Sequence, residues 1–161
     1  VDLAHAEHEA LLAASSLAPA QEYLQTQISG RLPLVKAVAR QMLAQRFGRL
    51  IHVSSIAAGL PAPGQGFYAM AKTAVEAMYL SLGVEMSQHG LTSLNLRLGL
   101  VDAGRGHRFL KVQKHKGAPS PPLVTQDQVA QSLCFLLSDA ALAMTCTTIV
   151  MDAGATAIKY A

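Results

Sequence analysis

The stretch GFYAMAKTAVEAMYLSLGVEMSQ, residues 66–88, lies between two short apolar runs, RLIHVSS at residues 49–55 and LTSLNLRLG at residues 91–99. Its apolar residues recur at helical spacing and His89-Gly90 follow it, so it predicts one long helix. The two flanking runs alternate or are rich in β-branched residues, which is typical of strands. A strand, a helix and a strand in this order favour parallel pairing with a helical crossover.

Similar patterns predict further helices and a further strand on both sides of this unit. Residues 4–16 are rich in alanine and leucine and predict a helix, and residues 21–47 predict another, ended by Gly48 in the C′ position. Residues 125–139 begin with a capping threonine and predict a helix, and residues 147–154 predict the last strand. The chain is therefore expected to form a single α/β domain with a parallel sheet.

Composition and charge narrow the classes of function. Of the 161 residues, 51% are hydrophobic and 14% are charged, which suits one packed domain without disorder. The net charge is +3, there is no tryptophan, and basic residues cluster only in residues 104–116, so a solvated loop or helix is a better interpretation than a nucleic-acid surface. No apolar run is long enough for a membrane span and no signal peptide is evident, so we expect a cytoplasmic protein.

Metal binding and disulfide formation are not expected. His5 and His8 are spaced as on a helix but have no further ligands nearby, and the other histidines are scattered. Cys134 and Cys146 lie in apolar surroundings without C-x-x-C spacing. We therefore expect two buried thiols in a reducing compartment.

A serine, a tyrosine and a lysine are expected at one edge of the sheet. Ser54 and Ser55 end a predicted strand, and ligands of parallel α/β sheets bind beyond the carboxyl ends of the strands. Tyr68 and Lys72 begin the next helix four residues apart, so their side chains share a face. The ammonium and the helix N-terminus both favour the phenolate and are expected to lower the phenol pKa from about 10. With a serine hydroxyl holding the substrate oxygen, the tyrosine is expected to exchange a proton with it while a hydride moves at the carbon.

These pieces together resemble the short-chain dehydrogenase/reductase family, especially its 3-oxoacyl-reductase-like members. The resemblance covers residues 48–156 and includes Ser55 at the family's usual distance ahead of Tyr68. It rests on GRLIHVSSIAAG, on Tyr68-x-x-x-Lys72 followed by AVEAM, on LNLRLGLVDAG, and on QVAQSLCFLLSD with TTIVMDAGAT near the C-terminus.

The resemblance implies the C-terminal portion of a Rossmann-type doubly wound parallel sheet in three α/β/α layers. It also implies an NAD(P)(H)-dependent oxidoreductase that interconverts a carbonyl and an alcohol. In that scheme Ser55 orients the substrate oxygen, Tyr68 is the general acid/base, and Lys72 lowers the tyrosine pKa and holds the nicotinamide ribose. Tyr68, Lys72, Gly99 and Val101 are the expected contacts of an NADP or NAD cofactor.

Residues 100–122 form a long polar insertion, and insertions of this length commonly carry function or move. In the family plan this is the substrate loop. We interpret it as a mobile lid whose Phe109, Leu110 and Val112 face an acyl or other apolar substrate. An exposed helix with incidental charges is the alternative.

The N-terminal part departs from the family pattern. Before Ser55 there is no Gly-rich phosphate-binding turn, no residue that sets NAD against NADP, and no Asn-Asn-Ala-Gly stretch, although residues 1–3 are interpreted as a remnant of that strand. Gln27 stands where the family has an asparagine, and its longer side chain is expected to misplace the proton-relay water. Without the first strands, we expect an open sheet edge and a bare face beside the serine strand.

The sequence from the end of the predicted strand at residues 91–99 onward also departs from the family pattern. The family's Pro-Gly is Leu98-Gly99, the threonine of the following loop is Ala103, and the late Asp-Gly-Gly has Ala153 at its centre. These changes are expected to weaken cofactor contacts without abolishing the fold.

Two functions of different classes stay open. The first is the oxidoreductase, acting on a small-molecule carbonyl or alcohol. The second is a non-catalytic structural or interaction subunit of the same fold that has lost cofactor binding. The resemblance further implies a homo-oligomer, a dimer or tetramer, paired through the helix before the serine strand and the helix of Tyr68. Nucleic-acid and membrane partners are not expected.

Overall fold

The computed structural model describes residues 1–3, 10–115 and 121–160. Three parallel strands form one sheet in the order β1-β2-β3, with bounds β1 (Gly48–Ser55), β2 (Leu91–Leu98) and β3 (Thr147–Met151). β1 and β2 pair along their whole length, from Gly48 opposite Leu91 to Ser55 opposite Leu98. The predicted α/β fold with a parallel sheet is confirmed, and all three strands end at the same edge.

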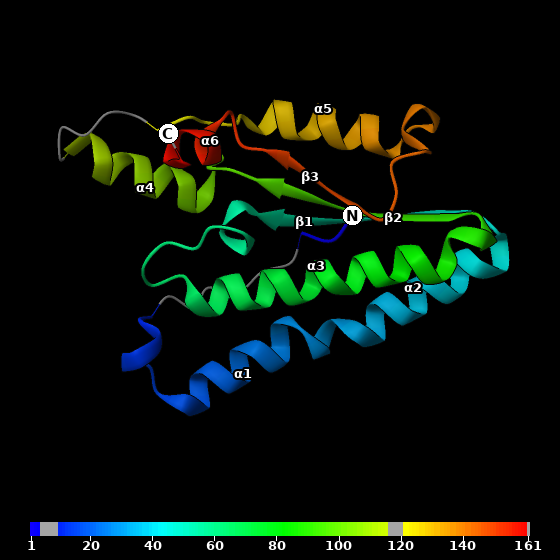
Figure 1. Ribbon diagram of the computed structural model, residues 1–161, viewed down its shortest axis with the longest axis horizontal. Helices are drawn as coiled ribbons and strands as arrows, with labels where there is room; N and C mark the ends of the chain where they lie inside the picture. The colour runs from blue at the N-terminus through cyan, green and yellow to red at the C-terminus, as the bar shows by residue number, and fades with distance from the viewer. Residues whose placement is uncertain (4–9, 116–120, 161) are drawn as a thin grey trace.

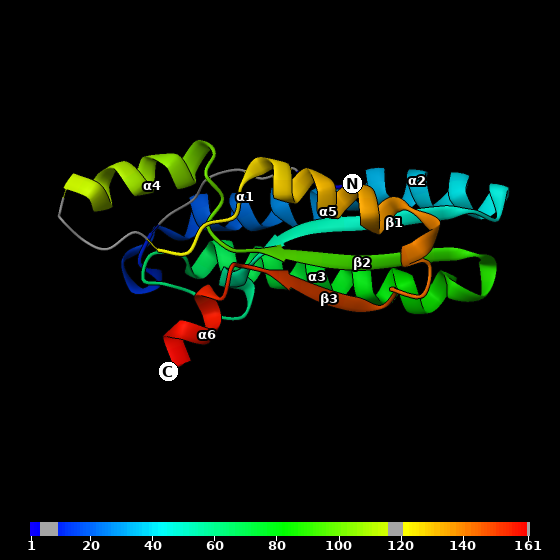
Figure 2. The same cartoon turned by 90° about the horizontal axis from the view of Figure 1, so that it is seen from above.

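Helices cover both faces of this sheet (Figure 1). α1 (Leu17–Gln27), α2 (Leu32–Gln45) and α3 (Gly66–Met86) lie on one face, and α5 (Gln126–Leu137) lies on the other. α4 (Gly104–His115) and α6 (Ala155–Tyr160) lie beyond the ends of the strands (Figure 2). The order of layers is therefore helix, sheet, helix. Within the described ranges, no helix combines the length and the apolar composition that crossing a bilayer requires.

Each face of the sheet has its own apolar core. Successive strand residues point to opposite faces, so Leu50 and Ile51 belong to different cores. The core under α2 and α3 contains Val35, Ala39, Leu50, Val75, Tyr79, Met86 and Leu91. The core under α5 contains Ile51, Val53, Leu94, Leu96, Leu98, Leu136 and Ala141.

The edge of β1 is extended by one residue. The Asp2 N–H donates to the Ile51 carbonyl at 2.8 Å, and the Val53 N–H donates to the Asp2 carbonyl at 2.9 Å. This isolated parallel bridge joins Asp2 to His52. The interpretation of residues 1–3 as the remnant of an adjoining strand is supported by this pairing.

The expected bare face beside the serine strand is not found. Residues 48–54 of β1 are all buried. α5 packs over Ile51 and Val53, and Arg49 donates to the Leu136 carbonyl at 2.8 Å and also to the Ser138 carbonyl. An arginine at this place satisfies carbonyls that the C-terminal turn of α5 leaves without partners.

The prediction of one helix over residues 21–47 is wrong. The chain turns through a 3-10 segment, η2 (Ser29–Arg31), between α1 and α2. α2 ends at Gln45 with Arg46 in the left-handed conformation at φ 52°, and Gly48 already belongs to β1. Gly48 is therefore not the C′ residue of the helix.

Two smaller expectations also fail or lie outside the described residues. Of the helix predicted over residues 4–16, residues 4–9 lie outside the described part, as do His5 and His8, and the rest forms only the 3-10 turn η1 (Leu12–Ala14). Cys134 and Cys146 are exposed, so the prediction of buried thiols is wrong. Cys134 lies on the solvent side of α5, and Cys146 lies in the turn before β3 at φ 53°.

Candidate active site

Ser55 is the last residue of β1 and turns the chain toward α3. Its Oγ accepts a hydrogen bond of 3.2 Å from the Ala57 N–H and thereby caps the 3-10 turn η3 (Ile56–Ala58). The neighbouring Ser54 is buried, and its Oγ has no hydrogen-bond partner among the described residues. Of the two serines at the strand end, Ser55 is the one that is partly exposed.

Tyr68 and Lys72 lie in the first two turns of α3, on the same side of the helix. Lys72 Nζ is 6.0 Å from the centroid of the Tyr68 ring. The Ser55 side chain makes a hydrogen bond with the Tyr68 phenol. The fold therefore brings Ser55, Tyr68 and Lys72 together at the carboxyl edge of the sheet.

The environment of Lys72 weakens its hold on a proton. The side chain is buried, and Nζ donates a hydrogen bond of 2.8 Å to the Val53 carbonyl. Burial, together with the charge of Arg31, lowers the pKa of Lys72 to about 8, although the carboxylates of Asp2 and Glu76 act in the opposite direction. At neutral pH the amine is still mostly protonated, but it exchanges protons more readily than an exposed lysine.

The pKa of Tyr68 does not follow the expectation from the sequence. Burial raises the pKa of the phenol above its ordinary value, and the hydrogen bond with Ser55 only partly offsets this. The expected lowering is therefore not observed, because desolvation of the phenolate outweighs the favourable contacts. Tyr68 is held as the neutral phenol, which is the form that donates a proton.

Gly99 and Val101, the other expected cofactor contacts, follow β2 at the same edge. The Gly99 N–H donates to the Met151 carbonyl at 2.9 Å, and a Cβ on Gly99 would lie 2.7 Å from the Cα of Asp152. Glycine at this position is thus required by the close approach of the chain after β3. Val101 is half-buried and forms a parallel bridge with Val124.

Gln27 ends α1 and is bound to Arg31. Arg31 Nε donates to the Gln27 carbonyl at 2.7 Å, and Arg31 Nη2 donates to Gln27 Oε1 at 3.2 Å. Arg31 Nη1 also contacts both oxygens of Asp2, at 2.5 and 2.7 Å. Both the backbone and the side chain at the asparagine position are therefore engaged by one guanidinium.

A group of buried polar residues behind the site was not singled out from the sequence. Asp2 accepts from the Tyr79 hydroxyl at 3.1 Å and lies 3.7 Å from Nδ1 of the fully buried His52. Glu76 and Arg97 form a bidentate pair with contacts of 2.7 and 2.6 Å. The sequence features that could have indicated the Glu76–Arg97 pair are an arginine inside an apolar strand and a glutamate one helical turn after Lys72.

The loop interpreted as a lid forms α4. Phe109 is 46% exposed, and the side chain of Val112 lies outside the described part of the chain. His107 Nδ1 and Asp102 Oδ1 are 3.1 Å apart at the start of this helix. No group of three or more potential metal-ligating side chains occurs among the described residues.

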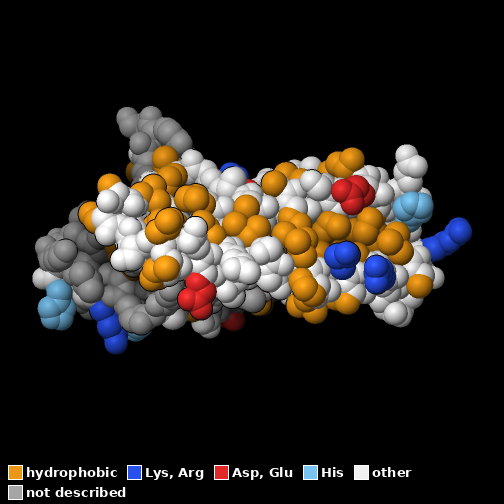
Figure 3. Space-filling view, turned by 90° about the horizontal axis from the view of Figure 1, so that it is seen from below, with side chains coloured by type: hydrophobic (Ala, Val, Ile, Leu, Met, Phe, Trp, Pro, Cys, Tyr) orange, Lys and Arg blue, Asp and Glu red, His pale blue; other side chains and the backbone are white. Residues whose placement is uncertain are grey.

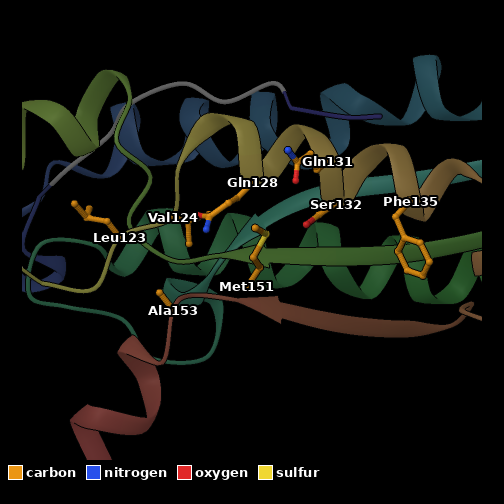
Figure 4. Close-up of a pocket in the computed structure, with 8 residues that line it drawn as sticks. All are labelled: Leu123, Val124, Gln128, Gln131, Ser132, Phe135, Met151 and Ala153. Carbon is orange, nitrogen blue, oxygen red and sulfur yellow. The ribbon is translucent and has the colours of Figure 1, made fainter.

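A hollow of about 480 Å³ lies elsewhere, between α5 and β3 (Figure 4). Its walls include Val124, Gln128, Phe135, Met151 and Ala153. None of the three candidate catalytic side chains lines it.

The comparison with protein families decides the classification. The family model described as enoyl-(acyl carrier protein) reductase matches residues 2–156. The chain belongs to the short-chain dehydrogenase/reductase family. A solved structure described as a short chain dehydrogenase/reductase family protein superposes with a TM-score of 0.85 at 23% identity, over 97% of this chain and 66% of that one.

Curated relatives of this short-chain dehydrogenase/reductase are longer proteins. It is 29% identical over 136 residues to 3-oxoacyl-(acyl-carrier-protein) reductase FabG of Haemophilus influenzae, a match covering 83% of this chain and 56% of the relative. It is 27% identical over 149 residues to 2,3-dihydro-2,3-dihydroxybenzoate dehydrogenase of Escherichia coli, covering 84% and 60%. Nodulation protein G of Rhizobium meliloti is 27% identical over 134 residues, covering 81% and 55%. The chain thus spans about half the length of the curated relatives it matches.

Proposed function

We propose that this chain carries the proton-transfer site of an NAD(P)(H)-dependent oxidoreductase that interconverts a carbonyl and an alcohol. The observation that carries the proposal is the meeting of Ser55, Tyr68 and Lys72 at the carboxyl edge of the sheet, with the serine hydrogen-bonded to the phenol. Relatives named as a 3-oxoacyl reductase and a dihydroxybenzoate dehydrogenase support the reaction class.

The three residues have distinct tasks in this proposal. In the reducing direction the substrate carbon gains a hydride and its oxygen gains the phenol proton of Tyr68, which yields an alcohol. Ser55 donates a hydrogen bond to the substrate oxygen and holds it beside the phenol. The ammonium of Lys72 stabilises the phenolate that remains and then helps to reprotonate it.

The residues present fit the nicotinamide end of the cofactor. A bound NADP or NAD would supply or accept the hydride. Lys72 has three N–H donors, of which Val53 accepts one, so the ammonium can also bind ribose hydroxyls. Tyr68 lies beside it, and Gly99 and Val101 follow β2 at the same edge. Residues 1–161 contain no Gly-rich phosphate turn, so no phosphate contact is assigned to this chain.

The proposal is tested with the purified protein and both nicotinamide cofactors. Binding is followed by NADPH or NADH fluorescence, and turnover by absorbance with a panel of small ketones, aldehydes and acyl thioesters. We expect saturable binding and cofactor oxidation with at least one carbonyl compound. If the complete gene product shows no cofactor binding and no turnover, the proposal is overturned.

A non-catalytic subunit is the second candidate, and the Gln27 position favours it. Arg31 donates hydrogen bonds to both the backbone carbonyl and the side-chain oxygen of Gln27, so both acceptors at the family's asparagine position are already engaged by a guanidinium. This candidate predicts that Tyr68→Phe changes neither stability nor partner binding. A Tyr68→Phe variant that loses an activity of the wild type would exclude it.

We also propose that the chain associates with a second copy through the layer of α1, α2 and α3. A band of hydrophobic side chains runs along the face seen from below (Figure 3). Helices of this layer carry the exposed apolar residues Leu17, Leu32, Leu34, Leu43, Met70 and Val84. Leu34→Glu combined with Val84→Glu is expected to convert a dimer or tetramer into smaller species in light scattering after size exclusion. An unchanged mass would contradict this surface.

A further inference from the structure

An ion pair between the buried Glu76 and the partly buried Arg97 lies next to the three candidate catalytic residues. Arg97 Nε donates to Glu76 Oε1 at 2.7 Å and Arg97 Nη2 donates to Glu76 Oε2 at 2.6 Å, so both carboxylate oxygens are bound by one planar fork. Glu76 is only 4% exposed, and its backbone carbonyl accepts a hydrogen bond of 3.2 Å from Asn95. The glutamate lies one helical turn after Lys72, and Arg97 lies opposite Ser54 in β2.

The same guanidinium touches the loop that follows Ser55. A Cβ on Gly59 would lie 3.0 Å from Nη1 of Arg97 and 3.7 Å from its Cζ, so the guanidinium lies against the bare Cα of Gly59. Gly59 directly follows η3, the turn that Ser55 caps. Thr73 Oγ1 donates to the Ala58 carbonyl at 2.9 Å and fastens this loop to α3 a second time.

A role in fixing the relative orientation of α3 and β2 explains this ion pair better than a contribution to the stability of the fold does. A buried ion pair contributes little net stability compared with apolar side chains of the same volume. A bidentate pair between arginine and carboxylate does fix the relative position of the two elements that carry it. Tyr68, Lys72 and Glu76 follow one another at four-residue spacing on α3, so fixing Glu76 also fixes the face that carries the phenol.

We propose that Glu76 and Arg97 are positioning residues that hold Ser55 within hydrogen-bonding distance of Tyr68. One edge of the guanidinium is bound by Glu76 on the tyrosine helix, and its Nη1 supports Gly59 in the serine loop. Neither residue touches substrate or cofactor. The consequence for catalysis rests on the proposed function, whereas the Ser55–Tyr68 contact can be measured without turnover.

The test uses the phenol pKa at position 68 as a reporter of that contact. A difluorotyrosine placed at position 68 of the full chain is more acidic than tyrosine, so it titrates in a pH range where the fold persists. Charge alone predicts opposite shifts, because Arg97→Gln removes a positive charge and raises this pKa, whereas Glu76→Gln removes a negative charge and lowers it. Loss of the Ser55 hydrogen bond raises the pKa in both variants.

We therefore expect both variants to raise the pKa at position 68, in the same direction as Ser55→Ala. In the Ser55→Ala background the Ser55 hydrogen bond is already lost, so adding either substitution is expected to produce no further rise from that cause. Shifts of opposite sign, or no shift in either variant, overturn the proposal. If the glutamine variants do not fold, Arg97→Lys and Glu76→Asp replace them, because these substitutions keep the charges but alter the bidentate contact. An unchanged pKa at position 68 in both of these variants overturns the proposal equally.

Arg49→Gln is the matched control. Arg49 is a strand arginine whose guanidinium is likewise hydrogen-bonded within the protein, but it is bound at the end of α5 on the other face of the sheet. The pKa at position 68 is expected to stay unchanged in this variant. A rise as large as that in Arg97→Gln would mean that the loss of any hydrogen-bonded strand arginine loosens the site, which contradicts a specific role.

Turnover gives the second measurement. In Arg97→Lys we expect kcat to fall about tenfold or more, because a small displacement of the serine misaligns the substrate oxygen. The KM for the cofactor is expected to stay within about twofold, since the lost interaction acts on the chemical step. A wild type without turnover would overturn the proposed function and leave the pKa test of the positioning pair intact.

Discussion

Lys72 Nζ donates a hydrogen bond of 2.8 Å to the carbonyl oxygen of Val53, two residues before Ser55. The bond ties the second turn of α3 to the end of β1, so the helix that carries Tyr68 and the strand that carries the serine are fixed to each other. An ammonium group has three donors, and one acceptor does not exhaust them. The lysine therefore ties the helix to the strand and keeps further donors for its proposed role in the site.

Replacing Lys72 by methionine is expected to change how stability depends on pH. Burial, together with the charge of Arg31, lowers the pKa of Lys72 to about 8 in the folded chain, from its ordinary value of 10.5. Between these two values the unfolded chain binds a proton that the folded chain does not, so the free energy of unfolding of the wild type rises with pH. Urea unfolding at about pH 7 and about pH 9.5 is expected to show this rise in the wild type and not in Lys72→Met. An equal rise in both proteins would mean that another group is responsible.

Replacing Asp2 by asparagine is expected to destabilise the fold and to flatten its response to acid. Burial opposes ionisation of Asp2, but the nearby imidazole of His52 and the hydrogen bonds and charge of Arg31 hold its pKa well below its usual value of 3.8. Its contribution to stability is therefore present above about pH 4 and is lost as the pH falls below that value. At neutral pH we expect a loss of about 3 kcal/mol, because the partly buried Arg31 is left without its carboxylate.

Chemical unfolding of Asp2→Asn between about pH 2 and pH 7 measures both effects. Asp139→Asn is the matched control, since Asp139 is exposed in the 3-10 turn after α5. We expect it to keep the wild-type acid dependence. If Asp2→Asn lost stability in parallel with the wild type as the pH falls, the ion pair with Arg31 would not be the acid-sensitive contact.

Ala153→Gly is expected to stabilise the chain. Ala153 has φ 51°, a left-handed conformation that strains an L-residue with a Cβ, and glycine adopts it without this cost. We expect a gain of about 0.5–1 kcal/mol, or about 1–4 °C in Tm by calorimetry. Ala157→Gly, an exposed position inside α6, is expected to change Tm in the opposite direction. A lower Tm for Ala153→Gly would contradict the strain.

The strands and the long helix could be predicted because their signals are local. The alternation in residues 91–98 and the helical spacing from Gly66 onward each specify an element, and Gly90 at φ 81° ends the helical region where expected. The break between α1 and α2 could not be predicted in this way. It is stabilised by Arg31, whose carboxylate partner Asp2 lies 29 residues earlier in the chain.

In the candidate site, too, the features with local signals could be predicted and those that depend on distant contacts could not. The four-residue spacing of Tyr68 and Lys72 and the strand end at Ser55 placed these residues at one edge from sequence alone. The direction in which the pKa of Tyr68 shifts could not be predicted, because it depends on how deeply the folded chain buries the phenol. The Glu76–Arg97 pair likewise depends on a contact between residues 21 positions apart.

The most direct test of the account is the rate of hydride transfer in Tyr68→Phe at saturating cofactor, compared with the wild type. We expect turnover to fall by about a hundredfold or more, because the substrate oxygen loses its proton donor. Cofactor fluorescence is expected to show that binding is retained, and circular dichroism that the fold is intact. Turnover of Tyr68→Phe at the wild-type rate would contradict the assignment of Tyr68 as the general acid/base.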